Sequence, residues 1–213
     1  MKKYKVITGV FAVVGVVALG ATAAYADSID IELEQIINTG TLHNDLVATD
    51  GVTPATRGLD FNPVTAFGST QDTSATYPAG TDKVLISNPG AADGGWNLSV
   101  QAKDGVSAKW VSGSDEFDFD DPAGSGYTNG QLTVNASGAT VSVAAPNTLT
   151  GVTPNPTATA FNSNNTINLV SAAAGSQDIW LGYLTGVQFA QKIPAGQAAG
   201  TYNITLTQTL ASI

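Results

Sequence analysis

The 213-residue chain contains no cysteine and a single histidine, His43. The absence of cysteine excludes a disulfide scaffold, a thiol nucleophile and any metal site with thiolate ligands. One histidine cannot form a multi-histidine metal site, and Ser-His-Asp catalysis would depend on this residue alone. Because these absences remove the commonest catalytic constellations, we expect a protein that is not an enzyme.

Basic residues are also scarce, with 8 Lys and Arg against 17 Asp and Glu and a net charge of −9. Nucleic-acid binding depends on Lys and Arg that neutralise phosphates, so the composition argues against a nucleic-acid partner. The hydrophobic content of 43% is that of a globular protein rather than a disordered one.

The N-terminal segment has the features of a secretory signal peptide. Three lysines lie among the first five residues, an apolar stretch covers 6–19, and Ala24-Tyr25-Ala26 supplies small residues for signal peptidase. The alternative is an uncleaved membrane anchor. We expect residues 1–26 to be removed on export and residues 27–213 to form the mature domain. Three of the 8 basic residues leave with the segment and none of the 17 acidic ones does, so the mature net charge is −12.

The mature region is predicted to be all-β. Apolar and polar residues alternate with a period of two over 96–102, 132–134, 139–143 and 202–210. This period is typical of strands with one buried face. Segments 83–87 and 178–184 are more continuously apolar, as in strands covered on both faces. Turn residues separate these runs, which predicts one antiparallel β-sandwich or barrel-like domain.

Two segments do not follow this pattern. Segment 144–166 contains Pro146, Pro154 and Pro156, and we expect a long surface loop because proline cannot donate to a central strand. Segment 29–37 fits either a strand or a short helix.

Gly94-Gly95-Trp96-Asn97-Leu98 resembles the first Trp-x-Leu signature of the WxL domain, a surface module of low-GC Gram-positive bacteria. Other motifs follow in the family's order over nearly the whole mature chain: Thr39-Gly40-Thr41-Leu42, Leu59-Asp60-Phe61 with Phe67-Gly68, the segment 129–143, and Ala199-Gly200-Thr201-Tyr202. At the place of the second signature the chain has Gln208-Thr209-Leu210, which keeps the leucine and lacks the tryptophan.

The resemblance implies non-covalent attachment to peptidoglycan or another cell-wall glycan. It makes Trp96, Leu98, Gln208 and Leu210 the candidate wall-binding residues. It also implies assembly with other WxL proteins and with a membrane-anchored WxL-binding protein.

Trp96 has two interpretations. An indole can stack on the apolar face of a sugar ring, which makes it a binding candidate. Alternatively, Trp96 and Leu98 share one face of a strand and fill the core between two sheets, and we favour this because alternation is strict around them. Gln208 is expected to face solvent, because a buried amide would need hydrogen-bond partners.

The densest charge cluster is an acidic run over residues 115–121. Its carboxylates are hard oxygen ligands that could bind Ca²⁺, although the run lacks the glycine and final glutamate of an EF-hand. Phe117 and Phe119 alternate with the acids, which favours a strand with two buried rings and hydrated carboxylates, and no cofactor. The weak Ca²⁺ candidates are Asp115, Glu116, Asp118, Asp120 and Asp121.

These observations lead to one main hypothesis and two alternatives. The main one is a secreted, non-catalytic protein of the cell wall or cell surface that binds wall glycan. The second is a structural subunit of a surface fibre or extracellular matrix, joined through strand edges, because the alternating run from Tyr202 to Ile213 could pair with a neighbour. The third is an extracellular hydrolase, which would need two carboxylates facing each other across a cleft.

Overall fold

Strands make up all the regular secondary structure of the described residues except one 3₁₀ turn, Gly105–Ser107. The computed structural model describes residues 35, 40–56, 59–65, 68–90, 94–121, 130–163, 165–177 and 179–213. The predicted signal peptide, residues 1–26, lies outside these ranges, as does segment 29–37 apart from residue 35. The strands belong to one unit, Asn38–Ile213. None of the described helical structure is long or apolar enough to span a membrane.

The described residues contain no α-helix, so the all-β prediction is confirmed. The pairs that their strands form are all antiparallel. The strands are β1 (His43–Val47), β2 (Gln71–Tyr77), β3 (Lys83–Pro89), β4 (Trp96–Ala102), β5 (Trp110–Ser112), β6 (Asp115–Phe117), β7 (Asp120–Asp121), β8 (Gly130–Asn135), β9 (Thr140–Val143), β10 (Val152–Pro154), β11 (Thr159–Ala160), β12 (Ile167–Ala172), β13 (Ile179–Thr185), β14 (Val187–Ile193) and β15 (Leu206–Ser212).

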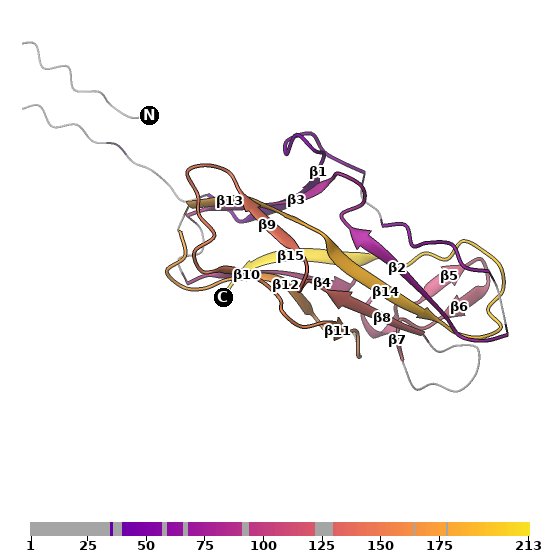
Figure 1. Cartoon of the computed structure of the whole chain (residues 1–213). Coiled ribbons are helices and arrows are strands. Elements are labelled where there is room, and N and C mark those ends of the chain that lie inside the picture. The colour runs from indigo at the N-terminus through magenta and orange to yellow at the C-terminus, as the bar shows by residue number, and fades with distance from the viewer. Residues whose placement is uncertain are drawn as a thin grey trace, which may run out of the picture. The chain divides into compact units, whose positions relative to one another are not determined.

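Three sheets and one hairpin contain these strands. The β13 sheet has the order β1-β3-β13-β9, the β14 sheet has β11-β8-β14-β2 with β7 beside β8, and the β4 sheet has β10-β12-β4-β15. The hairpin is β5-β6. Among the described strands no sheet closes on itself, so the architecture is sandwich-like rather than a closed barrel (Figure 1).

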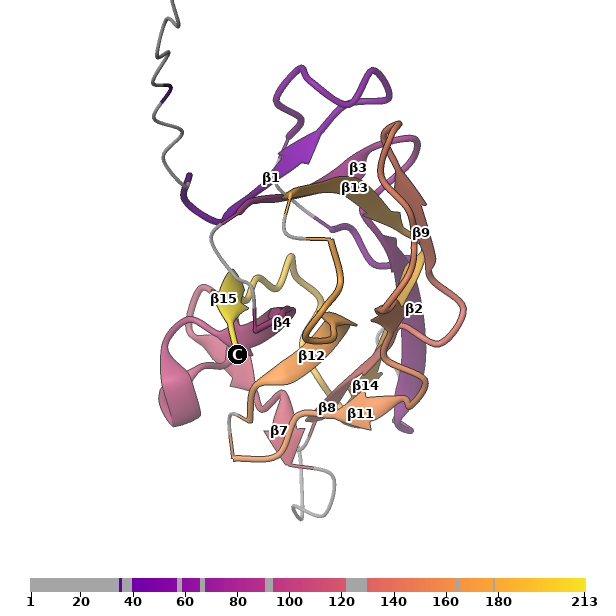
Figure 2. The ribbon, with the colours of Figure 1, turned by 90° about the vertical axis from the view of Figure 1, so that its left-hand side faces the viewer.

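The β13 and β14 sheets are connected by chain segments that run from one into the other. β2 continues into β3, β8 into β9 and β13 into β14, and these strands are neighbours in the same order in both sheets. Gly186 is the single residue between β13 and β14, with φ 81°. This left-handed conformation favours glycine and allows the chain to turn the corner. Figure 2 shows the two sheets meeting at an angle around the core.

The β4 sheet covers the inner face of the β13 sheet (Figure 2). Its buried side chains include Trp96 and Leu98, which meet Trp180 and Ile86 from the opposite sheet in one core. Burying each large apolar side chain stabilises the fold by about 1.5–3 kcal/mol. Gly95, just before β4, has φ 105°, and a Cβ there would lie 2.4 Å from the Ala172 carbonyl oxygen. The position therefore requires glycine.

Two expectations about segments need correction. Segment 144–166 is not only a loop, because it contains β10 and β11. Both are short strands at sheet edges, where Pro154 is tolerated because no partner needs its missing N–H. The C-terminal strand begins at Leu206 rather than at Tyr202, because the preceding residues reach the hairpin instead, where Asn203 bridges to Val111.

Candidate functional site

Trp96 and Leu98, the first predicted signature, point from β4 into the core. Both side chains are 0% exposed. The Trp96 ring lies 5.1 Å from the ring of Trp180 on β13, measured between centroids. The core-packing interpretation is therefore confirmed for both residues. Stacking of Trp96 on a sugar is not compatible with this geometry, because protein covers both faces of its ring.

Gln208 and Leu210 lie on β15, the strand next to β4. Leu210 is directly opposite Leu98, whereas Gln208 is opposite Val100. The two signatures thus come together as neighbouring strands, but they do not form an exposed patch.

The expectation that Gln208 faces solvent is wrong. Its side chain is half-buried, and its amide oxygen accepts a hydrogen bond from the Tyr77 hydroxyl at 3.0 Å. Its amide nitrogen donates to the Asn44 side-chain oxygen at 2.7 Å. Because Tyr77 is on β2 and Asn44 on β1, this one amide links all three sheets. A buried amide needs partners, and here the tertiary structure provides them.

The acidic run follows the solvated-face interpretation only in part, because it forms two short strands, β6 and β7, and Asp118, Asp120 and Asp121 are half-buried. Phe117 and Phe119 are 2% and 0% exposed, while Asp115 and Glu116 face solvent. Asp118 forms an ion pair with Lys109, and this hydrogen bond raises the pKa of Lys109. Within the described ranges, no group of three or more His, Asp or Glu side chains could together hold a metal ion.

Asp50, in the turn after β1, has a carboxylate held by three donors. They are the Thr53 hydroxyl at 2.6 Å and the backbone N–H groups of Val52 and Thr53, each at 2.9 Å. These bonds, that from the hydroxyl first, lower the pKa of Asp50 from 3.8 to about 2. A depressed folded-state pKa means that this stabilisation is present above pH 3.8 and is lost as the pH falls through about 2.

We therefore expect the Asp50 carboxyl carbon to titrate near pH 2 by NMR. Replacing Thr53 with valine removes the strongest donor and should raise this pKa. Thr49→Val is the matched control, because the Thr49 hydroxyl bonds Thr81 rather than Asp50. An Asp50 pKa that stays at its ordinary value in the unmodified protein would contradict the assignment.

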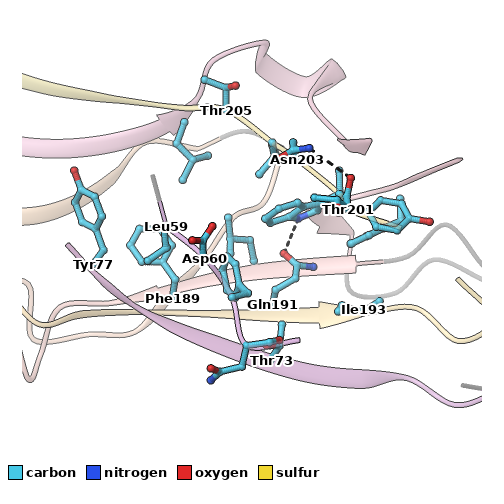
Figure 3. Close-up of a pocket in the computed structure, with 18 of the residues that line it drawn as sticks. Leu59, Asp60, Thr73, Tyr77, Phe189, Gln191, Ile193, Thr201, Asn203 and Thr205 are labelled. Atoms are coloured by element: carbon cyan, nitrogen blue, oxygen red, sulfur yellow. Dashed lines mark hydrogen bonds between the residues drawn. The ribbon is translucent and has the colours of Figure 1, made fainter. Parts of the chain in front are cut away.

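The described structure has a cleft of about 930 Å³ beside the β14 sheet. Its floor comes from β2 and β14, and its walls come from residues 59–65 and from residues 197–208 (Figure 3). Trp110 and Phe117 of the β5-β6 hairpin also contribute to the lining. The volume falls within the range of small-molecule and cofactor sites.

Hydrogen bonds fix the floor and one wall of this cleft. Gln191 on β14 is 2% exposed, and its amide oxygen accepts from the Trp110 indole N–H at 2.8 Å (Figure 3). Its amide nitrogen donates to the Lys192 carbonyl at 2.6 Å. On β2, the Thr73 hydroxyl donates to the Asn62 carbonyl at 2.7 Å, which fastens the 59–65 wall to the sheet. The cleft is therefore largely pre-formed.

Aromatic rings form a continuous series along one side of the cleft. Phe61 lies edge-on to Trp110 at 5.6 Å, Trp110 stacks on Phe117 at 6.0 Å, and Phe117 contacts Tyr202 at 5.1 Å, all between centroids. Trp110 and Phe117 are buried, whereas Phe61 and Tyr202 are half-buried. The two outer members therefore retain surface that a ligand can contact.

The polar groups of the lining are almost all neutral. Its charged residues are Asp45, Asp60 and Lys103. The neutral hydrogen-bonding residues are Asn44, Asn62, Thr65, Gln71, Thr73, Gln191, Gln197, Thr201, Asn203, Thr205, Thr207 and Gln208, with the hydroxyls of Tyr77 and Tyr202. Amides and hydroxyls both donate and accept hydrogen bonds, so this surface complements a ligand that is rich in hydroxyls.

Of the predicted binding residues only Gln208 lines the cleft. The cleft residues come from segments far apart in the sequence, so no local motif contains them. One local signal was present: in β14 the buried positions alternate, and Gln191 places an amide where the pattern calls for an apolar residue. No family model, curated protein or solved structure matches the chain. The resemblance to the WxL domain therefore stays a prediction.

Proposed function

We propose that this protein is an exported, non-catalytic surface protein that attaches non-covalently to the cell wall by binding a neutral stretch of wall glycan in the cleft. The cleft carries this proposal, because it combines partly exposed ring surface with many neutral hydrogen-bonding groups. The signature residues Trp96 and Leu98 then support the fold and do not touch the ligand. Other WxL proteins and a membrane-anchored WxL-binding protein remain predicted partners.

The charge distribution supports a neutral ligand. The chain carries a net charge of −9, which opposes close approach of an anionic polymer. The wall of residues 197–208 contains no charged residue. A ligand held there is recognised by hydrogen bonds and ring contacts rather than by ion pairs.

The position of Tyr202 supports recognition of a sugar ring. The Tyr202 hydroxyl donates to the Ala198 carbonyl at 3.0 Å and accepts from the Gln197 amide at 3.0 Å. These bonds and the contact with Phe117 hold the ring in place. An aromatic ring with an apolar face and a fixed orientation can contact the apolar face of a sugar at little entropic cost.

Removal of the Tyr202 ring tests the proposal. We expect Tyr202→Ala to weaken binding to purified peptidoglycan about tenfold or more, as loss of a central aromatic contact does at other recognition sites. Binding is measured by co-sedimentation of the purified protein with wall material. Circular dichroism and thermal unfolding of each variant establish that it is folded.

Tyr183→Ala is the matched control. Tyr183 is also a half-buried tyrosine, but it lies on β13 outside the cleft. This variant should bind like the unmodified protein. The proposal is wrong if the unmodified protein stays in the supernatant, or if the two variants lose binding equally while both remain folded.

A further inference from the structure

β15 is an edge strand with an unpaired side. The Lys103 N–H donates to the Thr205 carbonyl at 3.0 Å, and the Ile213 N–H donates to the Gly95 carbonyl at 3.2 Å. Odd-numbered residues thus direct their backbone groups toward β4. In an antiparallel pair these directions alternate, so the N–H and C=O groups of the even-numbered residues point away from the sheet. Those residues are Leu206, Gln208, Leu210 and Ser212. Among the described residues, no backbone hydrogen bond reaches them.

Three other edge strands carry a feature that hinders pairing. β10 contains Pro154, and β1 carries Asp45. On β2, the Ser74 carbonyl accepts a hydrogen bond from the Asn62 side chain at 3.1 Å. Proline, charge and a covering loop are the usual means of blocking an edge. β15 lacks two of these features, because Leu206–Ser212 contains no proline and no charged residue.

The electrostatics of this edge favour another copy of the same chain. With a net charge of −9, two copies repel each other over most of their surface. β15 and its neighbour β4 contain no charged residue. Two copies of the chain can therefore approach each other at β15 without bringing like charges together. The exposed side chains of β15 include Thr207, Thr209 and Ala211, which are small and neutral.

We propose that β15 pairs antiparallel with β15 of a second copy, joining the two β4 sheets into one. Thr209 is the middle residue of the strand. With Thr209 on the twofold axis, Leu206 pairs with Ser212, Gln208 pairs with Leu210, and every outward-facing backbone group finds a partner. Because the same edge is used by both copies, this contact is closed and gives a dimer. A fibre would need a second, different edge, so pairing through β15 alone gives a dimer and not a fibre.

Sedimentation velocity of the purified protein over a range of concentrations tests the dimer. The unmodified protein should show a reversible monomer–dimer equilibrium. Thr209→Lys places two like charges opposite each other at the axis and should raise the dimer Kd about tenfold or more. Asn168→Lys adds the same charge to an exposed position of β12, an interior strand of the same sheet, and should leave the Kd unchanged. The proposal is overturned if the unmodified protein is monomeric throughout, or if both variants behave alike.

The absence of cysteine allows a direct test of the contact. In Thr209→Cys, the introduced thiol is the only one in the chain. At a non-hydrogen-bonded antiparallel pair the two Cα atoms are about 4.5 Å apart, which is within reach of a disulfide. Mild oxidation should therefore produce a covalent dimer from Thr209→Cys and none from Asn168→Cys. Equal cross-linking of the two variants would show random collision and overturn the assigned edge.

Discussion

Replacing Trp96 by alanine is expected to lower the free energy of unfolding by about 3–5 kcal/mol, as truncation of buried tryptophans does in other cores. The side chain is 0% exposed, and its ring contacts Trp180 across the core. Its removal leaves a cavity between the β4 and β13 sheets that surrounding strands can only partly close. Urea unfolding followed by fluorescence and circular dichroism measures the effect. Because small domains are stable by about 5–15 kcal/mol, the loss is a large share of the total.

Trp96→Phe is the control for this experiment. It keeps a ring in the core and removes the indole N–H, which is buried without a hydrogen-bond partner among the described residues. An unpaired buried donor is unfavourable, so its removal offsets part of the lost packing. We expect a destabilisation clearly smaller than that of alanine. If Trp96→Ala instead retained full stability and abolished wall binding, Trp96 would be a contact residue and the core assignment would be wrong.

Replacing Gln208 by alanine is expected to lower the free energy of unfolding by about 1–3 kcal/mol. The amide accepts from Tyr77 at 3.0 Å and donates to Asn44 at 2.7 Å, so its loss leaves two half-buried polar groups without this partner. These bonds join β15 to β2 and β1, and their loss weakens the contact between sheets. Chemical denaturation of Gln208→Ala measures the change. A double-mutant cycle with Tyr77→Phe isolates the hydroxyl–amide coupling.

Thr209→Ala is the neighbouring control. Thr209 is exposed on the opposite face of β15, so this variant should change stability by less than about 0.5 kcal/mol. Similar losses for the two variants would mean that the strand itself, rather than the Gln208 bridge, determines the effect.

Most of the fold could be predicted because its determinants are local. Alternation with period two over 96–102 coincides with β4, since a strand with one buried face needs apolar residues at every second position. The same alternation correctly predicts that Phe117 and Phe119 are buried. It also correctly predicts that the first two acids of the run, Asp115 and Glu116, face solvent. The loop predicted for 144–166 was wrong in part, because edge strands of two or three residues carry almost no periodic signal and tolerate proline.

The sequence by itself determined the all-β class, the burial of Trp96 and Leu98, and the scarcity of positive charge, because each follows from composition or from neighbours one or two residues apart. Only the tertiary structure decided where the amide of Gln208 goes, since its partners Tyr77 and Asn44 are 131 and 164 residues away. It also decided the position of the cleft, whose rings and amides come from strands, a hairpin and loops that no single motif joins. Likewise, β15 is an edge only because of the strand order of the β4 sheet. A binding surface depends on which distant segments meet in the fold, and the long-range pairing of strands determines which segments meet.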